Sequence, residues 1–155
     1  MSDPTKTRSD PERQAALINE ISALIPAEVS GPWQRLTFNR RQLAMLAQHK
    51  LQVERPDGSV DRSQGVPGEV GDLLRELRKV MYKPGSGTWM SAQWTITNLG
   101  DGHADARATF DYDNEPEWSR PVRAFNYALD LEEFPRDPDT IPDWLAHRLQ
   151  EAGGG

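Results

Sequence analysis

The fold of this 155-residue chain is decided by the stretch Trp89–Tyr112, WMSAQWTITNLGDGHADARATFDY. Two segments of alternating polar and apolar residues flank its loop, Asn98–His103. Because successive side chains of a strand point to opposite faces, a period of two residues predicts a β-hairpin with one apolar and one polar face. Pairing Ile96 with Ala104 keeps the two apolar faces together. The apolar positions that alternate are Met90, Ala92, Trp94, Ile96, Ala104, Ala106, Ala108, Phe110 and Tyr112.

Two further strands and three helices are predicted outside this hairpin. Trp33–Phe38 and the alternating run Leu43–Val53 favour strands, and the polar segment Val60–Val66 favours a loop or a short edge strand. Apolar stripes near the helical period predict helices from Ser9 (as the cap) to Ile25, over Pro67–Met81, and from Thr140 onward. The solvent-facing side of the second helix is expected to hold Arg75, Glu76, Arg78 and Lys79.

The predicted element order is α-β-β-α-β-β-α, an α+β fold in which an antiparallel sheet of about four strands packs against helices. The proline-rich segment 114–139 is expected to be mostly loop, with a helical turn around Ala124–Glu133. We expect a single domain over residues 1–155, with residues 1–9 and 152–155 disordered. One core should include Trp94, Phe110 and Trp144.

Composition excludes several classes of protein. No segment approaches the ~18 uninterrupted apolar residues of a membrane-spanning helix. The first ten residues lack the apolar segment of a secretory signal. The chain has no cysteine, which excludes disulfides, thiolate metal sites and cysteine nucleophiles. We therefore expect a cytoplasmic protein with no membrane partner.

Acidic charge is concentrated in one segment. The net charge of the chain is −6, but residues 111–143 alone hold ten acidic and three basic side chains, a net of −7. A local field of this sign repels nucleic acid and attracts basic protein surfaces. The alternative is a solvated acidic face that serves solubility.

The sequence offers little support for catalysis. The three histidines, His49, His103 and His147, lie in three different predicted elements. Alternation on a strand would place the carboxylates of Asp111, Asp113 and Glu115 on one side, as a magnesium-dependent hydrolase requires, and this remains an alternative function. A calcium loop is excluded, because its sixth and twelfth positions are proline and valine. We predict no catalytic residues, no bound metal and no cofactor.

Two tryptophans favour a protein-binding face beside these acids. The predicted pairing places Trp89 opposite Asp111 on the polar side of the sheet, and Trp118 lies among acidic residues in a loop. Tryptophan is enriched among the residues that dominate binding energy at interfaces. The alternative is that each tryptophan packs beneath the proline-rich loop. The predicted partner-binding residues are Trp89, Ser91, Asp111, Asp113, Glu115, Glu117 and Trp118.

Several motifs resemble those of the YezG-like family of bacterial immunity (antitoxin) proteins, in its actinobacterial type. They are Leu74–Arg78 leading into Gly87–Ala92, then Phe110–Asp113, and the closing segment Phe134–Leu145, FPRDPDTIPDWL. The resemblance covers about residues 70–146 and implies a small α+β protein encoded beside a secreted polymorphic toxin. Such a protein binds its cognate toxin domain, commonly a nuclease, and protects the producing cell without catalysis. A free monomer is expected, and a housekeeping adaptor remains the other alternative.

Overall fold

The computed structural model describes residues 10–153, and its centre is a five-stranded antiparallel sheet in the order β3-β2-β1-β4-β5. The α+β class and the antiparallel sheet are therefore confirmed. The sheet has one strand more than expected, because the segment after the Pro56–Gly58 turn pairs with β2 as a short edge strand. The strands are β1 (Arg35–Gln42), β2 (Ala47–Glu54), β3 (Val60–Asp61), β4 (Ser91–Gly100) and β5 (His103–Asp111).

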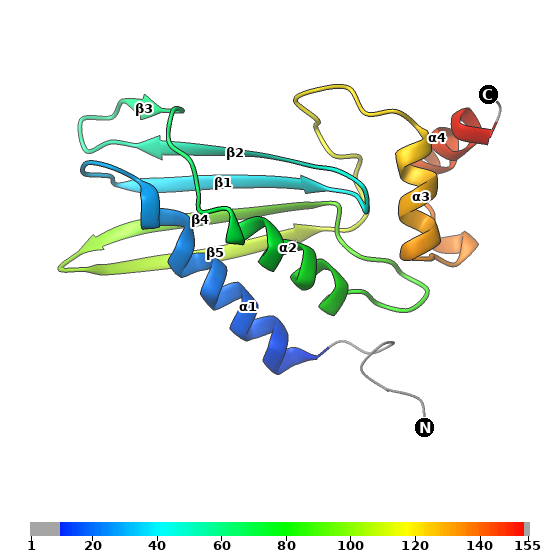
Figure 1. Ribbon diagram of the computed structural model, residues 1–155, viewed down its shortest axis with the longest axis horizontal. Coiled ribbons are helices and arrows are strands. Elements are labelled where there is room, and N and C mark those ends of the chain that lie inside the picture. The colour runs from blue at the N-terminus through cyan, green and yellow to red at the C-terminus, as the bar shows by residue number, and fades with distance from the viewer. Residues whose placement is uncertain (1–9, 154–155) are drawn as a thin grey trace.

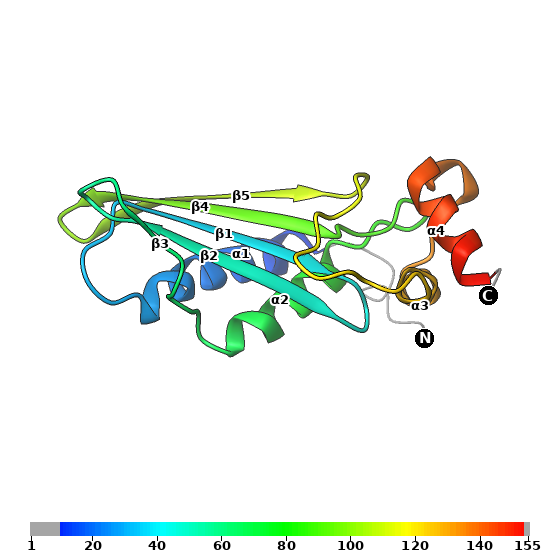
Figure 2. The same ribbon diagram turned by 90° about the horizontal axis from the view of Figure 1, so that it is seen from above.

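The helices fall into two groups. The first covers one face of the sheet, and the second lies beyond the ends of the strands (Figure 1, Figure 2). The first group is α1 (Pro11–Leu24), the 3-10 turn η2 (Ile25–Glu28) and α2 (Glu69–Val80). The second is α3 (Phe125–Glu133), the 3-10 turn η3 (Pro138–Thr140) and α4 (Asp143–Gly153). The helical turn expected near residue 124 is thus a full helix, which changes the element order.

The β4–β5 hairpin keeps the predicted faces with a different register. Ile96 pairs with Ala106, not with Ala104, and the chain reverses through Asp101 and Gly102, whose φ values are 55° and 78°. Positive φ at both central residues is typical of a two-residue turn that matches the twist of the strands. The actual pairing is two residues away from the predicted one, so the side chains within β4 and β5 stay on their expected faces.

Two predicted boundaries are wrong. The strand expected to end at Phe38 runs on to Gln42, and residues 43–46 form the turn that the alternating pattern had assigned to the next strand. In this turn the Leu43 amide donates to the Leu46 carbonyl at 2.9 Å. Helix α4 extends through Gly153, into the segment 152–155 that was expected to be disordered. The predicted Ser9 cap and residues 1–9 and 154–155 lie outside the described residues, and Asp10 caps α1 by accepting the Arg13 amide at 3.1 Å.

The core is divided in two. The main core lies between the sheet and α1 and α2, and Trp94 is fully buried in it. A second cluster joins the β1–β2 turn to the C-terminal helices through Leu43, Met90, Tyr127 and Leu145, and Trp144 packs against this cluster. The single core expected from the sequence is therefore wrong. Every helix of residues 10–153 is too short or too polar to span a bilayer.

Candidate functional site

One face of the sheet is left uncovered by helices, as the edge-on view shows (Figure 2). The alternating residues that point away from α1 and α2 form this surface, which we call the open face. It is polar throughout and comprises Thr37, Asn39 and Arg41 of β1, Gln48, Lys50 and Gln52 of β2, Ser91, Gln93 and Thr95 of β4, and Arg107, Thr109 and Asp111 of β5. The predicted residues Ser91 and Asp111 thus lie together here, as cross-strand partners.

The coil between β5 and α3 bounds the open face at one end. It crosses from β5 towards β2, where the Ser119 amide donates to Gln48 Oε1 at 2.8 Å and Gln48 Nε2 donates to the Arg120 carbonyl at 3.1 Å. Between this coil and the strands lies a hollow of about 600 Å³. Its lining includes Asn39, Arg41, Ser91, Gln93, Thr109, Asp111, Asn114, Glu115 and Glu117.

Arg41 gives this hollow a cation that the sequence analysis missed. Its Nη1 is buried and has no hydrogen-bond partner among residues 10–153. The carboxylates that line the same hollow belong to Asp111, Glu115 and Glu117, and none of them forms an ion pair with Arg41 within 4 Å. An unpartnered guanidinium hydrogen is costly to bury, so this position favours an acceptor from outside the described chain.

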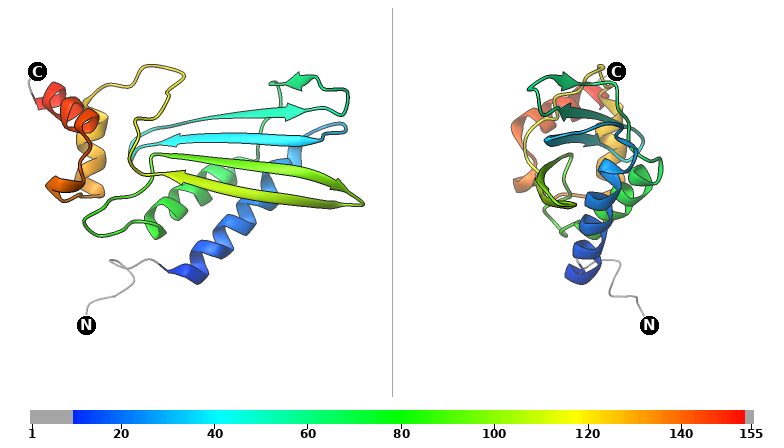
Figure 3. Two further views of the ribbon diagram at one scale, coloured as in Figure 1. Left: turned by 180° about the vertical axis from the view of Figure 1, so that it is seen from behind. Right: turned by 90° about the vertical axis from the view of Figure 1, so that its left-hand side faces the viewer.

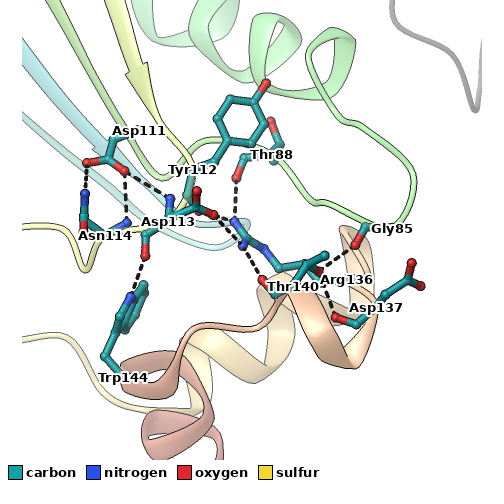
Figure 4. Close-up of polar contacts among 10 residues, drawn as sticks. All are labelled: Gly85, Thr88, Asp111, Tyr112, Asp113, Asn114, Arg136, Asp137, Thr140 and Trp144. Carbon is teal, nitrogen blue, oxygen red and sulfur yellow. Dashed lines mark hydrogen bonds and ion pairs between the residues drawn. The ribbon is translucent and has the colours of Figure 1, made fainter.

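Asp111 shapes the coil as well as facing the hollow. Its carboxylate accepts hydrogen bonds at 3.0 Å from the amides of Asp113 and Asn114 and from Asn114 Nδ2 (Figure 4). Partial burial raises the pKa of Asp111, but these bonds, led by those from Asn114, outweigh burial and lower the pKa below its ordinary value. Asp111 is therefore ionised at neutral pH and ends β5 with a turn.

The other predicted acids differ in what they contact. Asp113 is exposed and lies 3.5 Å from Arg136 Nη1. Glu115 Oε2 accepts from Arg148 Nε of α4 at 2.9 Å, which ties the coil to the C-terminal helices. Glu117 is exposed and forms no ion pair with any described residue, so its charge is free to meet a partner.

Neither Trp89 nor Trp118 lies free on the surface, as a residue that anchors a binding partner would. Trp89 was expected on the polar face but is fully buried in the main core, 5.7 Å from the ring of Phe110. Strand β4 begins only at Ser91, so the alternation on which the prediction rested does not reach residue 89. Trp118 is half-buried against the second cluster, and its Nε1 donates to the Tyr127 hydroxyl at 2.8 Å. The alternative that each tryptophan packs beneath the proline-rich loop therefore fits Trp118, whereas Trp89 is buried in the main core instead.

The three carboxylates of the hydrolase alternative do not converge. Strand β5 ends at Asp111, and beyond it the coil turns each carboxylate to a different partner: amides for Asp111, Arg136 for Asp113 and Arg148 for Glu115. Within residues 10–153 no group of three or more histidines or acids is placed to hold a metal ion. The carboxylates of Asp111, Asp113 and Glu115 thus do not point to one common position, as the ligands of a magnesium ion must.

Parts of three motifs that carry the family resemblance meet at Arg136, which lies in the closing segment Phe134–Leu145 (Figure 4). The Arg136 side chain is 3% exposed. It donates to the Thr140 carbonyl at 3.0 Å, to the Thr88 carbonyl at 3.4 Å and to the Tyr112 carbonyl. A Cβ at Gly87, whose φ is +87°, would collide with the guanidinium. These contacts join three chain segments, so the motif residues here maintain the fold.

Trp144 and Asp137 add further contacts to this cluster around Arg136, which we call the joint. Trp144 Nε1 donates to the Asp113 carbonyl at 2.7 Å, and the Asp137 amide donates to the Gly85 carbonyl at 2.8 Å. The joint holds the C-terminal helices beyond the strand ends (Figure 3). No family model matches this chain, and no curated protein resembles it significantly in sequence.

Proposed function

We propose that this chain is an immunity protein that binds a cognate toxin domain and neutralises it without catalysis. The observation that carries the proposal is the open face of the sheet, which no helix of residues 10–153 covers and which ends in a hollow lined by Arg41, Glu115 and Glu117. Such a surface offers hydrogen-bonding groups over a broad area and has acids at its rim. It suits recognition of another protein, because polar rims and paired charges determine which partner is accepted.

The charges favour a basic partner. Three acids of residues 111–143 form ion pairs within the protein, since Asp130 pairs with Arg78, Glu115 with Arg148 and, more loosely, Asp113 with Arg136. Other acids of this segment are exposed and have no ion-pair partner among the described residues: Glu117, Glu132, Glu133, Asp137, Asp139 and Asp143. A toxin that cleaves nucleic acid needs a basic surface for the phosphate backbone, and an acidic inhibitor attracts that surface at long range.

The resemblance to immunity proteins supports the same proposal in a specific way. Several of its motif residues, Thr88, Tyr112 and Thr140, lie in the buried cluster around Arg136, while Ser91 and Asp111 of the same motifs lie on the open face. In this proposal the residues around Arg136 maintain the arrangement of sheet and C-terminal helices, and the open face supplies the contacts to the toxin. We propose a cytoplasmic location, where the toxin would otherwise act.

The first experiment separates an immunity protein from a housekeeping adaptor. The product of the adjacent upstream gene is expressed in cells with and without this protein, growth is measured, and the two products are purified together. We expect growth arrest without this protein, rescue with it, and a stable complex. A non-toxic neighbouring product that does not bind would contradict the proposal.

A pair of substitutions tests the surface itself. Gln93→Arg with Glu117→Arg places cations on two exposed positions of the hollow. Because like charges across an interface cost several kcal/mol, we expect binding of the toxin domain to weaken at least ~10-fold, or ~1.4 kcal/mol. Calorimetric titration and protection in cells measure the effect.

The matched control is Asn19→Arg with Glu20→Arg, which changes the charge by the same amount on the exposed side of α1. This control should bind as the unsubstituted protein does. Equal affinity of the two double variants, with both shown to fold, would place the interface elsewhere.

A further inference from the structure

A second cavity lies on the other side of the sheet, between the β1–β2 hairpin and the start of α2. It has a volume of about 410 Å³, within the range of ~300–1,000 Å³ that is typical of small-molecule sites. Apart from Arg40, no residue that lines it also lines the hollow on the open face. Its walls carry Arg40, Arg75 and His49 and contain no aspartate or glutamate. The remainder is largely apolar, with Phe38, Leu43, Leu46, Val66 and Val70.

Arg40 is the unusual member of this group, because it is 5% exposed and has no carboxylate within 4 Å in residues 10–153. Its Nε donates to Gln42 Oε1 at 3.0 Å, and its Nη1 lies 3.4 Å from His49 Nδ1. Its Nη2 has no hydrogen-bond partner among the described residues. Burial, and then the charge of Arg75, lower the pKa of Arg40 to about 10. A buried guanidinium is normally paired with an anion, and residues 10–153 supply none here.

Arg75 approaches Arg40 over the first turn of α2. The position that a Cβ on Gly71 would occupy lies 3.6 Å from Arg75 Nη1 and 3.7 Å from Arg40 Nη2. The carboxylate nearest to Arg75 is Asp72, which is 80% exposed and 3.7 Å away, too loose to neutralise the pair. Burial, and then the charge of Arg40, lower the pKa of His49, so the ring is neutral and its Nδ1 can accept from Arg40.

We propose that this cavity binds a small organic oxyanion, with its phosphate or carboxylate group between Arg40 and Arg75 and its apolar part against Met45 and Leu46. Guanidinium groups offer paired donors that match both oxyanions. The apolar side chains beside the two arginines favour a ligand that carries an apolar or aromatic group over a bare, strongly hydrated ion.

The test is calorimetric titration and thermal unfolding of the full chain with phenyl phosphate, benzoate, inorganic phosphate and the uncharged analogue phenol. Potassium chloride at equal ionic strength serves as the reference. We expect saturable binding of phenyl phosphate or benzoate and a rise in Tm beyond that in potassium chloride. Which of the two binds more tightly identifies the oxyanion. If neither binds, or phenol binds equally well, the proposal is overturned.

Variants locate the site. Arg75 is largely exposed, so Arg75→Gln should fold normally and weaken binding at least ~10-fold, whereas Arg107→Gln, which removes an exposed arginine from β5, should leave it unchanged. Arg40→Gln should abolish binding without lowering the Tm of the unliganded protein, because the buried charge that it removes has no anionic partner. A marked fall in Tm together with unaltered binding would show that Arg40 serves packing and not an anion.

Discussion

Replacement of Asp130 by alanine is expected to lower the free energy of unfolding by about 3–5 kcal/mol, because it leaves a buried guanidinium without its carboxylate. Arg78 of α2 is 1% exposed, and it donates from Nη1 to Asp130 Oδ1 at 2.5 Å and from Nη2 to Oδ2 at 2.7 Å. Asp130 also accepts the Ala44 amide at 2.7 Å. One carboxylate of α3 thus binds both a helix of the first group and the β1–β2 turn.

The other contacts of Arg78 keep its guanidinium buried when the Asp130 carboxylate is removed. Its Nε donates to the Trp89 carbonyl at 2.7 Å, and its guanidinium lies 4.8 Å from the centre of the Phe134 ring. The remaining guanidinium of an Asp130→Ala variant would therefore stay in an apolar site. Urea denaturation measures the change. Asp139→Ala, which removes an exposed acid of η3, should change stability by less than ~0.5 kcal/mol.

A double variant separates the net contribution of the Arg78–Asp130 ion pair from the cost of leaving one buried charge without its partner. Arg78→Met with Asp130→Leu removes both charges, and it should be less destabilising than the sum of the single changes. If Asp130→Ala alone cost under ~1 kcal/mol, the two helical groups would not depend on this ion pair.

The hairpin could be predicted from the sequence because its information is local. A strand with one buried face needs alternation, and Ala92, Trp94 and Ile96 supply it next to Phe110. The register could not be predicted, because a shift by two residues leaves every face unchanged. The Asp101-Gly102 turn and the register shift between Asn98 and Gly100 together decide the register, and the turn is the signal that the interpretation of Asn98–His103 as an open loop overlooked.

Arg78 shows what local patterns cannot reveal. Its spacing places it beside Arg75 and Lys79 on the polar side of α2, and its partner Asp130 lies 52 residues away in a segment expected to be mostly loop. Arg78 becomes buried only because α3 packs over that part of the polar side of α2. The same docking removes Asp130 from the set of free acids that the charge count suggested.

Part of the candidate site could be predicted, because it depends on the local alternation of the hairpin. Ser91 and Asp111 follow the hairpin alternation and lie on the open face. Arg41 was missed because the predicted strand ended at Phe38, so no position on the sheet was assigned to it. Extending the alternation of Leu36 and Phe38 to residue 42 would have placed Arg41 on the polar side.

Trp89→Ala should cost about 3–5 kcal/mol of unfolding free energy, since it removes a fully buried indole from the main core and leaves a cavity. Trp89→Phe should cost less than half of this. The Trp89 Nε1 is buried with no partner among residues 10–153, so phenylalanine loses volume but no hydrogen bond. It still faces Phe110 across the core.

Trp94 supplies the matched comparison, because it is also fully buried but its Nε1 donates to Ser22 Oγ of α1 at 3.0 Å. Trp94→Phe should therefore be more destabilising than Trp89→Phe by ~0.5–1.5 kcal/mol, the net value of one hydrogen bond. Equal losses in urea denaturation would mean that the Trp89 indole nitrogen has a bonded partner in solution.

Because Trp89 lies inside the core, a folded Trp89→Phe variant should bind the toxin domain with unchanged affinity, whereas Gln93→Arg with Glu117→Arg should not. A Trp89→Phe variant that keeps its stability and loses binding would return Trp89 to the interface and place the partner against the core side of β4.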